Sequence, residues 1–214
     1  MKEKNLAHMG SLLGGVVHNL NTPLMWVMGR AQLLQSRNEH FETLKNLSEE
    51  ELAKTKQKND KDITSILEGA DKIDFILKGL GYKIQMVNEG YTSVELREYL
   101  EMEMNFLMAD MRFKHDTKRD IAYGPRSYYA KVDYNALSGA VSGTINAMMD
   151  HTEKGRSIKI SLDSGIIHIS CAELKPDDKV RREIDEACSD LSPVADVMID
   201  DTSGLKVTIA LKDL

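Results

Sequence analysis

The sequence has few of the residues that define several common protein classes. Only two of its 214 residues are cysteine and only four are proline. Two cysteines cannot build the disulfide framework of a small secreted domain. The formal net charge of −6 argues against nucleic-acid binding through bulk positive charge. No apolar run reaches the roughly 20 residues that a membrane-spanning helix needs.

These shortages leave an ordinary globular protein. The first residues lack the apolar core and cleavage site of a signal peptide, so we expect a cytoplasmic protein with no membrane span. Hydrophobic residues make up 42% of the chain, enough for one or two domains. The histidines are scattered without metal-ligand spacing, and we expect no metal site.

Apolar residues in the first ninety positions recur at steps of three and four, the spacing of one helical face. In the second part of this region the steps continue without a break, as in a coiled-coil seam. We expect a long antiparallel helical hairpin, and a homodimer in which two hairpins form a four-helix bundle. The apolar positions are Leu6, Met9, Leu13, Val17, Leu20, Leu24, Val27, Ala31 and Leu34 in the first helix, and Ile63, Ile66, Ala70, Ile73, Leu77, Leu80, Ile84 and Val87 in the second.

A single histidine, His18, interrupts the apolar run of the first helix. Small residues, among them Gly14 and Gly15, flank it at helical spacing, so the strip around it is low and accessible. A glycine inside a helix costs about 1 kcal/mol relative to alanine. The two glycines therefore need a reason, and the close approach of another molecule is one. The alternative is that His18 is a boundary residue of the apolar face.

The stretch GSLLGGVVHNLNTPL, residues 10–24, resembles the phosphoacceptor box of two-component histidine kinases. That box has a histidine, usually an acidic residue, two variable positions, threonine or asparagine, proline and an apolar residue. The resemblance implies that His18 carries a phosphoryl group, because an imidazole nitrogen is a nucleophile near neutral pH. The matching positions are His18, Asn19, Leu20, Asn21, Thr22, Pro23 and Leu24.

Two neighbours of His18 divide the activities that this resemblance implies. The family usually has Glu or Asp directly after the histidine, as the base when the histidine attacks ATP, but Asn19 stands here and an amide cannot accept that proton. The alternative is that Asn19 is a tolerated surface amide. Four residues after the histidine, the family uses Thr or Asn to orient the water that removes phosphate from a partner aspartate, and Thr22 matches.

After residue 90 the pattern changes to short alternating segments, which predict a two-layer α/β sandwich and an α+β chain overall. We therefore expect one domain over 1–90 and another over 91–214. Asp133 is a suitable N-cap for one of the helices. The expected helices are 92–112, 133–152 and 177–191, the expected strands are 120–124, 127–133, 194–200 and 205–211, and a β-hairpin is expected over 157–172 around Asp163, Ser164 and Gly165.

This order of segments resembles the ATPase domain that histidine kinases share with gyrase. Asn146 matches the asparagine that binds magnesium in that family, although Ser142 stands where the family has asparagine or an acidic residue. The family's glycine-rich nucleotide loops are missing. The segment 168–179 has no glycine, and the segment 191–207 has only Gly204. Because backbone N–H groups reach phosphates through glycine-permitted turns, we expect nucleotide binding to be lost.

An intact phosphoacceptor hairpin on a degenerate ATPase domain resembles the dimeric histidine phosphotransferases of phosphorelays. The implied function exchanges a phosphoryl group between His18 and the aspartate of a response-regulator receiver domain, or removes it, with Mg²⁺ supplied by the receiver and without ATP. One alternative is an ATP-dependent histidine kinase with a diverged nucleotide site that includes Asn146. Another is a non-catalytic pseudokinase scaffold. The sequence leaves open whether the chain is an enzyme.

Overall fold

The computed structural model describes residues 1–40 and 48–212. Residues 41–47, part of the polar stretch expected between the two long helices, lie outside the described residues. The chain divides into two compact units. The hairpin unit is Val16–Lys78, and the sheet unit combines Met1–Gly15 with Gly79–Leu214. Both long helices therefore contribute to both units. The expected division into 1–90 and 91–214 stays a prediction.

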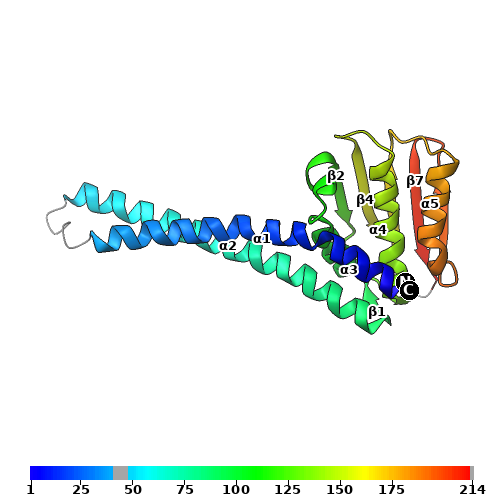
Figure 1. Ribbon diagram of the computed structural model, residues 1–214, viewed down its shortest axis with the longest axis horizontal. Helices are drawn as coiled ribbons and strands as arrows, with labels where there is room; N and C mark the ends of the chain where they lie inside the picture. The colour runs from blue at the N-terminus through cyan, green and yellow to red at the C-terminus, as the bar shows by residue number, and fades with distance from the viewer. Residues whose placement is uncertain (41–47, 213–214) are drawn as a thin grey trace. The chain divides into compact units, whose positions relative to one another are not determined.

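Helices α1 (Lys2–Glu39) and α2 (Glu49–Glu89) are the two long helices that the periodicity predicts (Figure 1). Helix α1 is continuous through Pro23. Helix α2 begins with a reciprocal cap, because the side chains of Ser48 and Glu51 each accept a hydrogen bond from the other residue's backbone N–H. The antiparallel helical hairpin is thus confirmed, and both helices extend beyond the apolar positions that predicted them.

The apolar rows of α2 separate into a covered row and an exposed row. Val87 is fully buried, whereas the exposed fractions of Ile63, Leu77 and Ile84 are 47%, 49% and 46%. The covered row consists of Ile66, Ile73 and Leu80, which are half-buried, and Val87; the exposed row is Ile63, Ala70, Leu77 and Ile84. A helix that is apolar on two faces has more apolar surface than one partner helix can cover.

Helix α1 shows the same two-sided character. Of the expected stripe, Met9 is buried, but Leu13 and Val17 are half exposed at 50% and 55%. The inner face of α1 is instead formed by neighbouring positions, including Leu12 and Val16. The periodicity located the helix correctly and left open which apolar row faces the chain itself.

The sheet unit contains a five-stranded mixed sheet of order β2-β4-β5-β7-β6. Strands β2 and β4 are parallel, and the remaining pairs are antiparallel. A separate antiparallel pair joins β1 to β3. The strands are β1 (Tyr91–Glu95), β2 (Lys118–Tyr123), β3 (Tyr129–Asp133), β4 (Ser157–Asp163), β5 (Ile166–Cys171), β6 (Ala195–Asp200) and β7 (Leu205–Leu211).

Helices α4 (Tyr134–Asp150) and α5 (Asp178–Cys188) pack beside each other over one face of this sheet (Figure 1). Burial alternates along the central strands, as in β4 and β5, so the inward side chains form the core with the helices. Asp133 caps α4 as predicted, because its carboxylate accepts a hydrogen bond from the Asn135 N–H. The two-layer α/β sandwich is confirmed.

The expected helix over 92–112 is wrong at both ends. Residues 92–95 belong to β1, because Tyr91–Glu95 pairs in register with Tyr129–Asp133 of β3. The helix that follows, α3, spans only Leu96–Leu107, and the Glu95 carboxylate caps it by accepting hydrogen bonds from two backbone N–H groups. A short π-helical turn occupies Arg112–Asp116. The strand was missed because its partner lies about 40 residues away along the chain.

A buried polar network joins α2, α3 and α4 within the sheet unit. The Lys83 ammonium lies 2.5 Å from the Glu103 carboxylate, and the two side chains are 1% and 0% exposed. Lys83 also donates to the Ser138 hydroxyl at 2.5 Å, and Tyr134 donates to Glu103 at 3.1 Å. A buried charge pair is tolerated only when its remaining hydrogen-bonding groups are satisfied. Here the Ser138 hydroxyl accepts from Lys83, and the hydroxyls of Ser138 and Tyr134 donate to Glu103.

Candidate functional site

The phosphoacceptor candidate His18 is exposed on α1, in the hairpin unit. Thr22 is exposed one turn later, and its hydroxyl donates a hydrogen bond to the His18 carbonyl oxygen at 3.3 Å. Asn19 is half-buried on the same helix. The structure thus brings His18, Asn19 and Thr22 together on two consecutive turns and leaves the imidazole open to solvent.

The glycines near His18 have different surroundings. A Cβ on Gly14 would meet nothing within 4 Å, so this position leaves the approach to His18 open. A Cβ on Gly15 would overlap the carbonyl oxygen of Ala109 in the same unit. The close approach expected at Gly15 is therefore made by this chain's own backbone. Gly14 remains the glycine at which another molecule could approach.

A hollow of about 490 Å³ lies further along the hairpin unit. Met25 and Gly29 line it, and they lie 7 and 11 residues after His18, which places all three near one line along the helix. Trp26 stands beside them with 53% of its surface exposed, and the Lys72 ammonium lies 4.8 Å from the centre of its ring. The face of α1 that carries His18 thus continues into an apolar concave surface with charged residues at its edge.

Asp62 ties the two helices of the hairpin unit together. Its carboxylate is almost fully buried and accepts hydrogen bonds from Arg30, at 2.9 Å, and from Arg37. The Arg37 guanidinium also donates to Asn59 at 2.5 Å. The hydrogen bond from Arg37 is the main reason that the pKa of Asp62 is lowered. This cluster fixes how α2 is aligned along α1 on the side of the hairpin that carries the hollow.

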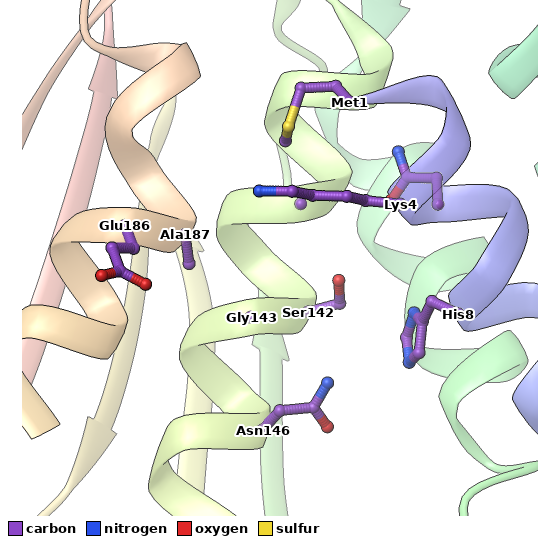
Figure 2. A pocket seen from close by; sticks show the side chains of 10 residues that line it. Met1, Lys4, His8, Ser142, Gly143, Asn146, Glu186 and Ala187 are labelled. Atoms are coloured by element: carbon purple, nitrogen blue, oxygen red, sulfur yellow. The ribbon is translucent and has the colours of Figure 1, made fainter.

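Asn146 lies in the sheet unit, on α4, where it borders a cavity of about 270 Å³ that we name the α4 cavity. Its walls come from the first turns of α1, from α4 and from α5, all within the sheet unit. Figure 2 shows the Asn146 amide pointing from α4 towards the side chain of His8 on α1. Ser142, one turn earlier, uses its hydroxyl hydrogen within the helix, donating to the Ser138 carbonyl oxygen at 2.6 Å.

His8 was not assigned a site from the sequence, and the structure places it in this cavity. Its ring meets Phe106 edge-on, with ring centres 6.4 Å apart. Burial lowers the pKa of His8, and the positive charge of Lys83 lowers it further. The sequence indicated only that Asn5 and His8 lie on one helical face, and it gave no sign that this face packs against α4. Asn5 makes that contact through its side-chain amide, which donates to the backbone and side-chain oxygens of Asn135, each at 3.0 Å.

The region around Asn146 is where nucleotide binding was expected to be lost. The first turns of α1 pack over α4, and the cavity left there is smaller than the roughly 300–1,000 Å³ of typical small-molecule sites. The segment between β5 and α5 contains no glycine. Gly204 has a φ of 98°, and a Cβ there would collide with the backbone of Ala172, so this glycine serves the packing of a tight turn. The loss of nucleotide binding stays a prediction.

Within the described residues, neither a metal cluster nor a membrane-spanning helix is found. No group of three or more His, Cys, Asp or Glu side chains is placed to hold a metal ion. None of the helices in 1–40 and 48–212 has the length and apolar character needed to span a bilayer.

No protein-family model matches the chain, and no curated protein matches it. Solved structures that are similar include the cytoplasmic segment of the histidine kinase QseC, with a TM-score of 0.45, 8% identity, and coverage of 58% of this chain and 79% of that one. The Acinetobacter baumannii histidine kinase AdeS has a TM-score of 0.43 and 12% identity, covering 92% of this chain and 98% of that one.

The catalytic domain of the histidine kinase ThkA has a TM-score of 0.45 and 10% identity, and the match covers 56% of this chain and 92% of that one. Likenesses of this strength establish no activity, ligand or partner. All three of these structures are described as those of histidine kinases.

Proposed function

We propose that this chain acts in two-component signalling as a dimeric histidine phosphotransfer protein, with His18 as the phosphoryl carrier and without ATP. The observation that carries the proposal is the position of His18. It is a solvent-exposed imidazole on a continuous helix, with Gly14 open before it and Thr22 one turn after it. Phosphoryl transfer depends mainly on positioning and charge neutralisation, and a rigid helix positions the nucleophile.

The transfer step requires only one reacting group from this chain. A ring nitrogen of His18 attacks the phosphorus of a receiver's aspartyl phosphate, the N–P bond forms, and the acyl-phosphate O–P bond breaks. The aspartate leaves as a carboxylate with the bonding electron pair. A Mg²⁺ ion held by the receiver would neutralise charge on the phosphoryl oxygens. The reverse reaction passes the phosphoryl group to a second receiver.

Asn19 and Thr22 limit what else the site can do. The Asn19 amide cannot take the proton that a histidine loses when it attacks ATP, which supports transfer between proteins over autophosphorylation. The Thr22 hydroxyl now donates to the His18 carbonyl oxygen. Rotation about its χ1 angle would free it to orient a water molecule, which supports a phosphatase activity towards the bound receiver.

The partner surface proposed for the receiver is the hollow on the His18 face of α1. Met25 and Trp26 supply exposed apolar area there, at 70% and 53% exposure, and Gly29 leaves space above the helix. Arg30 and Glu68 line the same hollow and add both signs of charge. Interfaces of this composition, with an aromatic anchor and a polar rim, are typical of protein recognition.

The proposed homodimer is inferred from the exposed apolar rows of α1 and α2. Ile63 and Leu77 on α2, and Val17 and Leu24 on α1, are each between 44% and 55% exposed in the single chain. Exposed apolar residues that repeat every seven positions are the pattern by which helices pair. Two copies of the hairpin unit would cover these rows in a four-helix bundle.

The deciding experiment is phosphotransfer from receiver domains that have been phosphorylated with radiolabelled acetyl phosphate and purified. Wild-type protein should acquire an acid-labile label, His18→Ala should not, and His40→Ala, which changes another exposed histidine of the chain, should behave as wild type. Thr22→Ala should keep the transfer and lose the release of inorganic phosphate. Label acquired from ATP without any receiver would establish the kinase alternative. If no receiver in a full panel shows transfer or dephosphorylation, the non-catalytic scaffold is the remaining alternative.

A further inference from the structure

The α4 cavity contains a polar atom that no described residue satisfies. The Oδ1 atom of Asn146 is buried, and no donor among the described residues reaches it. More than nine in ten buried polar groups in folded proteins have a hydrogen-bond partner. Because the amide points into the cavity (Figure 2), a ligand with an N–H or O–H group would satisfy it.

His8 supplies complementary groups on the opposite wall. Its ring has no hydrogen bond to any of the described residues and contacts Phe106 only by its edge. Of the charged groups around it, Lys83 and Arg112 lower its pKa, and Glu103 and Asp110 oppose them, with burial as the largest effect. The ring is therefore neutral at pH 7, with one N–H donor and one nitrogen acceptor.

Charged side chains of both signs line the cavity. Lys4 on α1 and Glu186 on α5 both line it, and neither forms an ion pair within the described part of the chain. The remaining wall is mainly apolar and small, with Gly139, Gly143 and Ala187 among the lining residues. A ligand that fits has both charges at its outer end, a short apolar stem, and a donor together with an acceptor at its inner end.

We propose that the α4 cavity binds a free amino acid with a carboxamide side chain, that is, glutamine or asparagine. The side-chain NH₂ would donate to Asn146 Oδ1, and the side-chain carbonyl would accept the N–H of His8. The α-carboxylate would pair with Lys4 and the α-ammonium with Glu186. The volume of about 270 Å³ suits a molecule smaller than a typical drug-sized ligand. This binding site is separate from the His18 chemistry and does not depend on it.

The test is isothermal titration calorimetry of the full chain with L-glutamine and with L-asparagine. L-Leucine, which has the same charges and no carboxamide, and ATP with Mg²⁺ serve as competing ligands. Glutamine or asparagine should bind at least about tenfold more tightly than leucine, because a site with a buried acceptor rejects ligands that leave it unpaired. Leucine binding as tightly as both amides, ATP binding that displaces them, or no binding of either amide would overturn the proposal.

Variants separate the cavity from any other binding surface. Asn146→Leu keeps the size of the side chain and removes the acceptor, and His8→Phe keeps the aromatic ring and removes both nitrogens. Each should weaken the binding at least about tenfold, the equivalent of one or two hydrogen bonds. Lys4→Ala should also weaken it, whereas Lys2→Ala, one helical half-turn away and not part of the lining, should leave it unchanged. Circular dichroism identifies variants that are unfolded. Unchanged affinity in folded Asn146→Leu and His8→Phe proteins would contradict the assignment.

Discussion

The buried pair of Lys83 and Glu103 leads to a quantitative prediction about stability. Lys83→Met removes the ammonium and keeps a side chain of similar length, so Glu103 is left as a buried carboxylate with only the hydroxyls of Ser138 and Tyr134. Removing one partner of a buried ion pair costs about 3–5 kcal/mol. Because two hydroxyl donors remain, we expect the loss to be near the lower end, about 3 kcal/mol.

The double variant Lys83→Met, Glu103→Leu tests the cause of this loss. It removes both charges, and apolar replacements of buried ion pairs are often neutral or stabilising. We therefore expect most of the loss to be recovered, so that the double variant is clearly more stable than Lys83→Met alone. A double variant that is as unstable as the single one would refute the reasoning, because it would mean that lost packing and not an unpaired charge causes the effect.

The assay must report on the sheet unit, since the chain has two compact units and need not unfold in one step. Amide hydrogen exchange of α3 and α4 during urea titration meets this requirement. The fluorescence of Trp26, the single tryptophan, follows the hairpin unit separately. Lys78→Met is the matched control. Its ion pair with Asp74 is exposed to solvent, and the loss of such a pair changes stability little.

Three further predictions concern the hairpin and its ends. Gly15→Ala should lower the melting temperature measured by circular dichroism, because the added Cβ would overlap the backbone carbonyl group of Ala109. Gly14→Ala places its Cβ in open space and should raise the stability by up to about 1 kcal/mol. Equal effects of the two variants would contradict the close packing of Gly15. The pKa of Asp62 is lower in the folded chain than the ordinary carboxyl pKa of about 3.9. Its bond to Arg37 therefore stabilises the fold fully at pH values above about 3.9. This stabilisation is lost as the pH falls through the lower pKa of the folded state. Tryptophan fluorescence should show this acid sensitivity reduced in Asp62→Asn, and an unaltered pH profile would exclude the carboxylate as its source. Leu77→Asp should convert a dimer to a monomer in light scattering, and a stable dimer would show that the exposed row of α2 is not the interface.

The elements that sequence reasoning predicted best are those whose signals are local. The seven-residue rows of α2 and the cap of α4 by Asp133 depend on neighbours within a few residues. The turn at Ser164 and Gly165 is similar, since both residues have positive φ, 52° and 80°, as a two-residue hairpin requires. These features appear in the structure where the sequence places them.

The features that it missed depend on distant partners. Lys83 and Glu103 look like surface charges in the sequence, and only the packing of α2 against α3 buries them as a pair. His8 could not be linked to Asn146, which lies on a helix more than a hundred residues later. The role of His18 stays a prediction from its motif, and only the structure distinguishes the open Gly14 from the packed Gly15.

The two apolar rows of α2 also restrict how the length of this helix can change. Both rows repeat every seven residues, and each residue turns the helix by about 100°. A single inserted residue between Ala70 and Ile73 would rotate everything that follows, turning the row that contains Leu80 and Val87 away from the surface it covers. An insertion of seven residues would restore both rows. Relatives of this chain should therefore differ in the length of α2 by whole heptads, with insertions of other lengths confined to the connection before it.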